Sequence, residues 1–448
     1  MPELPDRFSS TPGQLAAIAQ RALELARSGG ASAAEIDVSQ GIGQNVSVRK
    51  GEIETIEYNR DNGVSLTVYI GQQRGHASSS DCSDEALSAT VEKALAIARY
   101  TAADPASGLA DPTLLAPEWN DLDLHHPWPL AVEDAAELAR RCEAAAFAVD
   151  PRIRNSEGAT VSSYESQFVY ANSNSFAGGY RGSRHGVSCA VIAEQDGAMQ
   201  RDYWYSTSRS AEELEAPETV GRRAGERAVR RLGGRKIDTR QTPVVFDAPV
   251  AAGLIGHFVG AVSGGSLYRR ASFLLDSMGQ SVFAPLVQIR EEPHLARGLA
   301  SAPFDDEGVA TKPRDVVKDG VVCGYFLGSY SARKLNLQST GNAGGNHNLL
   351  VSPGEQDLRG LLRQMDTGLL ITELMGQGLN PVTGDYSRGA VGFWVEGGEV
   401  QFPVEEITVA GNLKQMFRDI VAIGNDLEKR GSKQVGSILI GNMTLAGN

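Results

Sequence analysis

Apolar residues near the start of the chain repeat with the period of an α-helix. The stretch from Thr11 to Gln14 has the form of a capping box, and an apolar stripe follows it as far as the Gly29-Gly30 pair. A second stripe of this kind runs from Ser83 to about Tyr100. Capping residues before a helical stripe and glycines after it mark the ends of helices. We therefore predict one helix in each stretch.

Between these helices, from Glu35 to Ser80, apolar and polar residues alternate with the period of a β-strand. Such alternation is typical of strands that bury one face. Glycines interrupt the alternation, and we interpret them as turns between several successive antiparallel strands. The predicted turns are at Gly41, Gly43, Gly51, Asn62-Gly63 and Gly71.

The next part of the chain repeats this order of elements. Thr101–Pro129 is rich in Asp, Pro and Ala and has no period, which predicts a linker. Leu130–Asp150 has the pattern of a helix, and strand-like alternation then continues to Ser210. A helix, strands and a helix thus occur twice, and one sequence does not decide whether this is a true repeat. The closing helix and the residues after it carry Arg222, Arg223, Arg227, Arg230, Arg231, Arg235 and Lys236.

The C-terminal part is dominated by strand and turn signals. A helix of small residues is predicted around Ala251–Val262. Val391–Val395 and Val400–Phe402 flank Glu396–Glu399, a short glycine-rich connection typical of an antiparallel hairpin. The whole pattern predicts an α+β fold. We expect an N-terminal α/β domain (1–115), a strand-rich middle α+β domain (116–237) and a larger β-rich C-terminal domain with antiparallel sheets (238–448).

The composition is that of an ordinary globular protein, with 41% hydrophobic and 22% charged residues. A chain of 448 residues exceeds one ordinary core, so two or three domains are expected. No apolar run reaches the roughly 20 residues of a membrane span, and the first ten residues lack the features of a signal peptide. We therefore expect a cytoplasmic protein with no membrane contact. Reduced thiols are expected because the cysteines lie far apart, at Cys82, Cys142, Cys189 and Cys323.

The formal net charge of −13 argues against a protein whose main role is to bind nucleic acid. Neutralising phosphates requires a basic surface. The arginine-bearing helix after Ser210 is the local exception. We interpret it as a solvated helix face, and a patch for RNA or DNA is the alternative.

No complete motif of a known catalytic class is present. The chain contains no G-x-S-x-G, no H-E-x-x-H, no P-loop and no G-x-G-x-x-G. We therefore assign no catalytic residue from motifs.

Three clusters have residue types that can bind a ligand. Adjacent acids before Gly308 suit a cation or acid–base work, although a solvated turn is the more usual structure. The glycine-rich loop Gly341–His347 suits a ligand or a backbone that needs positive φ. A charge pair with two hydroxyls follows Gly384. The positions that we single out as substrate-contacting or structural are Asp305, Asp306, Asn342, Asn346, His347, Asp385 and Arg388.

The sequence around the predicted hairpin resembles that of the TldD/PmbA family of bacterial peptidase-complex proteins, and specifically its PmbA (TldE) branch. The resemblance is carried by Asp385–Gly389, Glu405–Asn412, Ser339–Ala343 and Phe304–Gly308. It runs through almost the whole chain and is densest from 244 to 448. It implies a subunit of a cytoplasmic metallopeptidase complex that processes peptide precursors and degrades small unfolded proteins. The implied partner is a TldD-like subunit, and a homodimer is expected to be able to form without it.

In the TldD branch, the resemblance places an H-E-x-x-x-H motif on the helix that corresponds to 251–262. Two histidines hold zinc, the glutamate is the general base, and a later cysteine is a further ligand. With His257 as the first histidine, Phe258 and Val262 replace the glutamate and the second histidine, and no cysteine follows Cys323. No other register recovers the motif, because His257 is the only histidine between His185 and His294.

The resemblance therefore implies no metal and no cofactor on this chain. His257 is a lone remnant, and the zinc is expected on the partner subunit. The alternative is a non-enzymatic regulatory or binding protein, as the family's older description as a modulator of DNA gyrase suggests.

Overall fold

The computed structural model describes residues 7–447. The expectation that the chain lacks a signal peptide rests partly on residues 1–6, which lie outside the described residues. Within 7–447, no helix is long and apolar enough to cross a membrane.

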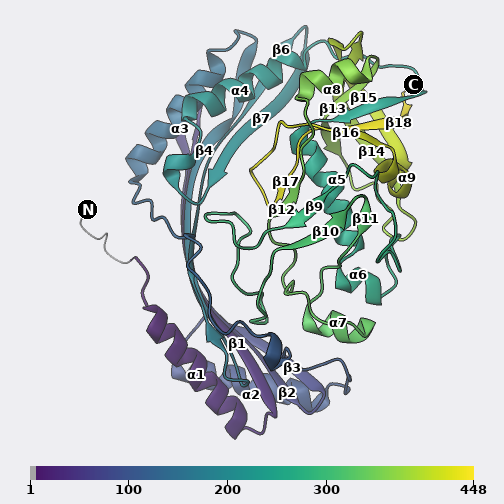
Figure 1. Cartoon of the computed structure of the whole chain (residues 1–448). Helices are drawn as coiled ribbons and strands as arrows, with labels where there is room; N and C mark the ends of the chain where they lie inside the picture. Colours follow the sequence, from purple (N-terminus) through teal and green to yellow (C-terminus); the bar gives the residue numbers. More distant parts are fainter. Residues whose placement is uncertain (1–6, 448) are drawn as a thin grey trace.

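One long curved sheet contains strands from both the first and the middle part of the chain (Figure 1). Its hydrogen-bonded order is β3-β2-β1-β4-β6-β7, with β5 attached to β4, and neighbouring strands are antiparallel. The central pairing joins β1 to β4, from Glu35 opposite Asn172 to Val48 opposite Ala159. The strands are β1 (Ala33–Arg49), β2 (Glu52–Ile70), β3 (Gln73–Ser79), β4 (Ile153–Asn172), β5 (Ala177–Gly178), β6 (Arg181–Gln195) and β7 (Ala198–Ser208).

Two glycines that we predicted to form turns lie inside β1 instead. A side-chain carbon at Gly41 would come within 2.4 Å of the Tyr164 hydroxyl, and one at Gly43 within 3.2 Å of the same ring. Both glycines therefore allow this ring to lie against the strand. Asn62-Gly63 lies inside β2, so these three turn predictions are wrong. The turn predictions that the structure confirms are those at Gly51 and Gly71, where φ is positive.

Four helices cover one face of the curved sheet, two at each end (Figure 1). On β1, Ile36 and Val38 belong to the core with α1 and α2, whereas Val46 and Val48 belong to the core with α3 and α4. Residues an even number apart on a strand share a face, so both helix pairs lie on the same side. The helices are α1 (Pro12–Ser28), α2 (Asp84–Tyr100), α3 (Val132–Phe147) and α4 (Pro217–Arg230), and the 3₁₀ turns are η1 (Pro112–Leu114) and η2 (Ala211–Glu213).

The two helices predicted from capping signals are confirmed. The Thr11 N–H donates to Gln14 Oε1 at 2.8 Å, and the Gln14 N–H donates to the Thr11 hydroxyl at 3.3 Å, which completes the capping box. The Ser83 hydroxyl accepts from the Ala86 N–H at 3.3 Å. Each cap satisfies N–H groups that a helix leaves without a partner in its first turn.

Two further sheets lie within the curve of the first (Figure 1). One has the order β15-β14-β13-β8-β18-β16, with β15 also pairing with β18, and the other has the order β11-β10-β9-β12-β17. Only the β13–β8 and β12–β17 pairings among the described strands are parallel. The strands are β8 (Arg240–Phe246), β9 (Ile289–Glu291), β10 (Arg314–Lys318), β11 (Val321–Val322), β12 (Leu349–Val351), β13 (Gly368–Met375), β14 (Asp385–Glu396), β15 (Glu399–Asn412), β16 (Ile420–Ile423), β17 (Lys433–Gln434) and β18 (Ile438–Ala446).

A single large core joins these two sheets with helix α5, which is the predicted helix of small residues. It includes Phe246 on β8, Phe258 on α5 and Ile289 on β9, all buried. The helices of this part are α5 (Ala248–Ala261), α6 (Gly264–Tyr268), α7 (Ser329–Leu335), α8 (Leu358–Met365) and α9 (Leu413–Arg418).

The predicted hairpin is formed by β14 and β15. Its two central residues, Gly397 and Gly398, have φ of +60° and +76°, as the favoured two-residue hairpin turn requires. The predicted α+β class with mainly antiparallel sheets is confirmed. The boundaries at 115/116 and 237/238 stay predictions, and the β1–β4 pairing joins the first two predicted units in one sheet.

Candidate functional site

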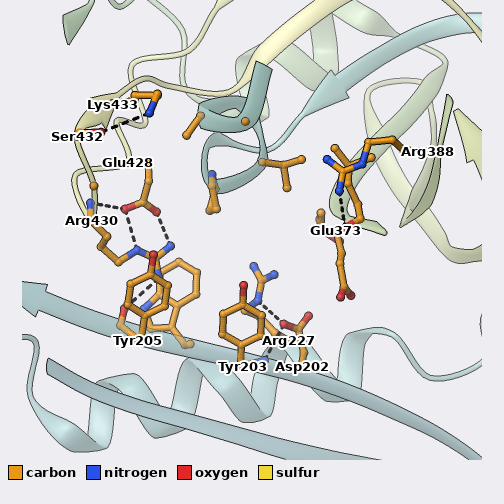
Figure 2. Close-up of a pocket in the computed structure, with 18 residues that line it drawn as sticks. Asp202, Tyr203, Tyr205, Arg227, Glu373, Arg388, Glu428, Arg430, Ser432 and Lys433 are labelled. Carbon is orange, nitrogen blue, oxygen red and sulfur yellow. Dashed lines mark hydrogen bonds and ion pairs between the residues drawn. The ribbon is translucent and has the colours of Figure 1, made fainter. Parts of the chain in front are cut away.

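A pocket of about 540 Å³ lies where the edge strand β7 faces the C-terminal part of the chain (Figure 2). This volume is within the range of ligand sites, which often form between domains. We call it the α5 pocket. Its lining residues are Asp202, Tyr203, Trp204, Tyr205, Arg227, Pro249, Val250, Ala252, Gly253, Thr372, Glu373, Leu374, Arg388, Glu428, Arg430, Gly431, Ser432 and Lys433.

Helix α5 presents its first turns to this pocket. The helix begins after Asp247, whose carboxylate accepts from the Ala248 N–H at 3.0 Å, and Pro249 occupies the first turn, where proline is favoured. Ala252 and Gly253 line the pocket one turn later. A side-chain carbon added at Gly253 would meet nothing within 4 Å. Open space therefore lies over this part of the helix.

His257 follows one turn further along α5 and is half-buried. Its ring meets the Tyr386 ring edge-on, with the two centroids 5.8 Å apart. Burial, and then the charge of Arg388, lowers the pKa of His257 below its ordinary value, so the imidazole is neutral at pH 7. The Tyr386 hydroxyl is buried and has no hydrogen-bond partner within 7–447, and burial raises the pKa of Tyr386 to about 12.

Phe258 and Val262 belong to the core rather than to the pocket. Both are 0% exposed, and the Phe258 ring packs edge-on against Phe283 with centroids 5.0 Å apart. The register set out above, with His257 as the first histidine of H-E-x-x-x-H, stays untested. The geometry favours a register in which His257 is the last position. The first two positions would then be Ala252 and Gly253, which line the pocket.

The donor set around His257 does not fit a zinc ion. A catalytic zinc usually has three protein ligands and one open position, and α5 offers a single imidazole. Arg388 lies close enough to lower the pKa of His257, and its positive charge opposes a divalent cation. Across residues 7–447, no three His, Cys, Asp or Glu side chains are grouped so that they could hold a metal ion.

An aromatic wall with a stacked arginine forms one side of the pocket (Figure 2). The guanidinium carbon of Arg430 lies 3.7 Å from the ring centre of Trp204 and 4.3 Å from that of Tyr205. Arg430 also donates to Glu428 Oε1 at 2.7 Å and to the Tyr205 carbonyl at 2.9 Å. Stacking and a carboxylate together fix this arginine in place, so its charge is already compensated.

A second charge network lies along β7 and β13. Arg227 donates to Asp202 at 3.1 Å, and Arg231 contacts both Asp202, at 3.6 Å, and Glu373. Arg231 is 9% exposed, so the interpretation of a wholly solvated arginine face is wrong for this residue. The prediction failed for Arg231 because its carboxylate partners, Asp202 and Glu373, lie on other strands and cannot be recognised from the sequence of the helix.

Arg388 and Lys433 are the two cations of the pocket that have no carboxylate partner among the described residues. Arg388 Nη2 donates to the Leu374 carbonyl at 3.4 Å, and its Nε is buried without a partner. Lys433 Nζ donates to the Ser432 hydroxyl at 3.4 Å. Burial lowers the pKa of Lys433 below its ordinary value. Figure 2 shows the two side chains on opposite sides of the pocket.

The predicted acidic cluster lies elsewhere, against the other face of the curved sheet. Asp305 is buried and its carboxylate accepts the N–H groups of Glu307, Val309 and Ala343 at 2.9–3.0 Å. Burial raises the pKa of Asp305 to about 7. Burial and then the charge of Glu307 raise the pKa of Asp306. In this position Asp305 fixes a turn.

The glycine-rich loop is held by a buried hydrogen-bond network. Glu291 Oε1 accepts from the Asn342 side chain and from the His347 N–H, both at 2.8 Å, and Glu291 Oε2 accepts from Arg314 at 2.7 Å. His347 Nε2 lies 2.9 Å from the Gly341 carbonyl. The Asn346 side chain donates to the neighbouring His347 carbonyl. These contacts are typical of a loop that supports the fold.

Of the seven positions singled out from the sequence, only Arg388 lines the α5 pocket. Asp385 is exposed and accepts from Thr383 and Asn412 at a turn. Sequence reasoning missed Lys433 and the aromatic run 203–205. The run was visible as three consecutive aromatic residues on a strand, but nothing in the sequence indicated that the strand is at an edge.

We expect the acids between the curved sheet and the C-terminal part to make stability depend on pH. Burial, and then the charge of Asp306, raises the pKa of Asp37 from 3.8 to about 6. An unfolded aspartate loses its proton near pH 4, so the folded state binds more protons between these values. Stability therefore falls as pH rises from about 4 to 6.

Replacing Asp37 with asparagine should remove this part of the pH dependence. The midpoint of thermal unfolding of Asp37→Asn should exceed that of the wild type at pH 8, and the difference should vanish near pH 4. Asp61→Asn, at an exposed position of β2, is the matched control and should change neither midpoint. An equal effect of Asp37→Asn at both pH values would contradict the assignment.

Models of the three domains of the PmbA/TldA metallopeptidases match this chain in order. The matched residues are 34–98 for domain 1, 125–232 for the central domain and 239–447 for the C-terminal domain. The chain thus has the domain organisation of the PmbA/TldA metallopeptidases.

Curated relatives match over nearly the whole chain. Metalloprotease PmbA of Escherichia coli O157:H7 is 50% identical over 426 residues, which cover 95% of this chain and 94% of that protein. A PmbA homologue of Haemophilus influenzae is 49% identical over 428 residues, or 95% of each chain. The chain belongs to the PmbA/TldE family.

Solved structures agree with this assignment. A protein from Bacteroides thetaiotaomicron, described as a candidate modulator of DNA gyrase, superposes with a TM-score of 0.92 at 27% identity, over 97% of this chain and 99% of that one. TldE of Thermococcus kodakarensis has a TM-score of 0.85 at 18% identity, over 96% of this chain and 100% of that chain, and shows the shared fold.

The TldD branch is also detected by sequence. A TldD homologue of Buchnera aphidicola is 20% identical over 397 residues, covering 83% of this chain and 80% of that protein.

Proposed function

We propose that this chain is the metal-free subunit of a cytoplasmic metallopeptidase whose other subunit is TldD-like. The observation that carries the proposal is the pocket-facing side of α5. Its open positions are Ala252 and Gly253, and they are followed by a single imidazole, His257, which has Arg388 as a neighbour. The TldD-like subunit would supply the zinc and the general base.

The substrates would be peptides and unfolded proteins, as the names of the metalloprotease relatives support. The α5 pocket suits such ligands because an aromatic wall lies beside polar groups. Tyr203 on that wall is 44% exposed and available for contact. A role in binding nucleic acid has less support, since arginines of α4 are engaged by carboxylates of the chain itself.

The metal content of the purified chain tests the proposal. The tag-free protein, alone, should retain far less than one zinc ion per chain after gel filtration and should not cleave an unfolded peptide. His257→Ala is the matched control and should leave the zinc content unchanged. One retained zinc per chain, together with cleavage that a chelator abolishes, would overturn the assignment of this subunit as metal-free.

The alternative function is that of a non-enzymatic regulator. Identifying the proteins that co-purify with the chain from cells distinguishes it from the peptidase complex. A metal-carrying paralogue recovered with it supports the peptidase complex, and a topoisomerase recovered in its place supports regulation. The same experiment should also measure the oligomeric state of the chain. We expect a homodimer alone and a mixed assembly once the TldD-like subunit is present.

A further inference from the structure

The α5 pocket contains more positive than negative charge. Of its seven charged lining residues, five are compensated within two networks: Asp202, Arg227, Glu373, Glu428 and Arg430. Arg388 and Lys433 remain, and no carboxylate of the described chain pairs with either. An uncompensated charge in a partly buried pocket is costly, and an anionic ligand would remove that cost.

Arg388 has the donors that such a ligand needs. Its guanidinium makes one long hydrogen bond, to the Leu374 carbonyl at 3.4 Å, and its buried Nε makes none. A guanidinium has five N–H donors in a planar fork that matches a carboxylate. The acid next to it in the pocket wall, Glu373, is already bound by Arg231.

We infer that the α5 pocket binds the C-terminal carboxylate of a peptide, with Arg388 as its principal ligand and Lys433 as a second cation on the opposite wall. This goes beyond the proposed function, because the site is complete on this chain and needs no partner subunit. It can therefore fail while the two-subunit assembly stands, and the converse also holds.

The walls of the pocket favour a peptide end over a small inorganic anion. The ring of Tyr203 and the apolar side chains of Val250 and Leu374 also line the pocket. These surfaces can bury the side chain of a C-terminal residue while its carboxylate meets the guanidinium. A volume of about 540 Å³ holds about one or two residues, given that drug-sized ligands occupy pockets of roughly 300–1,000 Å³.

The test measures binding of one peptide in two chemical forms. The probe is a dye-labelled peptide of four alanines and a C-terminal phenylalanine, as the free acid and as the C-terminal amide. Fluorescence anisotropy with the intact wild-type chain should show the amide binding roughly 10- to 100-fold more weakly, because a charge-assisted hydrogen-bond pair is lost.

A thermodynamic cycle links this loss to Arg388. Arg388→Gln should weaken binding of the free acid by most of this factor, and in this variant the acid should keep only the roughly 2- to 5-fold preference over the amide that Lys433 supplies. Arg388→Lys keeps the charge but not the fork and should fall between. Lys433→Gln should weaken the acid only roughly 2- to 5-fold, as for a partly exposed ion pair. Lys414→Gln is the matched control, because Lys414 is exposed and does not line the pocket.

Several results would overturn the inference. One is equal binding of acid and amide by the wild type, which needs no variant and is therefore independent of how the variants fold. Another is a discrimination between acid and amide that is as large in Arg388→Gln as in the wild type. Competition separates the sources of the anion: acetate or phosphate that displaces the dye-labelled acid at the concentration of the unlabelled acid would assign the pocket to small anions and overturn the peptide assignment.

Discussion

Mixing this chain with a zinc-bearing TldD-like subunit is expected to start the cleavage of extended peptides that neither protein cleaves well alone. This expectation follows from the proposed function: the donor set around His257 does not fit zinc, so the zinc and the general base would come from the second chain. The measurement is the rate of release of a fluorescent product from an unfolded peptide as the ratio of the two proteins is varied. The rate should reach a plateau at a fixed stoichiometry.

Variants on the two chains should have very different effects on this rate. Replacing the glutamate of the partner's H-E-x-x-x-H with glutamine should reduce cleavage by about 10²- to 10⁴-fold, the usual loss on removing a general base. His257→Ala on this chain should leave both the zinc and the rate nearly unchanged. If His257→Ala removed the zinc or abolished all cleavage, His257 would be a working ligand and this subunit would not be metal-free.

Placing a glutamate at Phe258 should prevent the C-terminal part from folding, whereas a glutamate at Gly253 should be tolerated. The Phe258 side chain is 0% exposed and packs edge-on against both Phe283 and Phe417. Removing such a ring and burying a carboxylate in its place costs more than about 4 kcal/mol. At Gly253 the new side chain would enter open space. The measurements are the soluble yield and the midpoint of thermal unfolding.

This pair of variants also decides between the two possible registers of α5 against the H-E-x-x-x-H motif. If the glutamate position corresponds to 253, Gly253→Glu restores the carboxylate on the side of α5 that faces the pocket. Phe258→Leu keeps the core apolar and is the control, with a much smaller loss of stability than Phe258→Glu. Equal stability of Phe258→Glu and Gly253→Glu would show that position 258 reaches the pocket, and the register with His257 first would then be supported.

The helices and the hairpin could be predicted from the sequence because their signals are local. The Thr11 capping box and the Gly397-Gly398 turn act within a few residues and need no knowledge of the remaining fold. The glycines inside the long strands misled the prediction for the opposite reason. Gly41 is needed because the Tyr164 ring, which comes from a strand more than a hundred residues later, lies against it.

The candidate site depended even more on distant contacts. Arg388 could be singled out from the sequence as a charge near a turn. Its proposed role as a ligand depends on having no carboxylate partner within residues 7–447, and only the fold shows this. The acids around Asp305 suggested a cation site in the sequence. In the structure, the Asp305 carboxylate instead accepts three backbone N–H groups and fixes a turn. Lys433 carried no signal in sequence because its neighbours in the pocket come from β7 and α5.

The pairing of β1 with β4 has a consequence for how the chain is made in the cell. Strand β1 ends at Arg49, and its partner β4 begins only at Ile153. At the usual pace of synthesis of about 5–20 residues per second, the ribosome needs roughly 5–20 s to add the residues between them. Once β2 (Glu52–Ile70) has also been made, β1 has β2 on one side and an open edge on the other until β4 follows, and open edges recruit other chains. The newborn protein must be shielded there, or stay unfolded, until its middle has emerged.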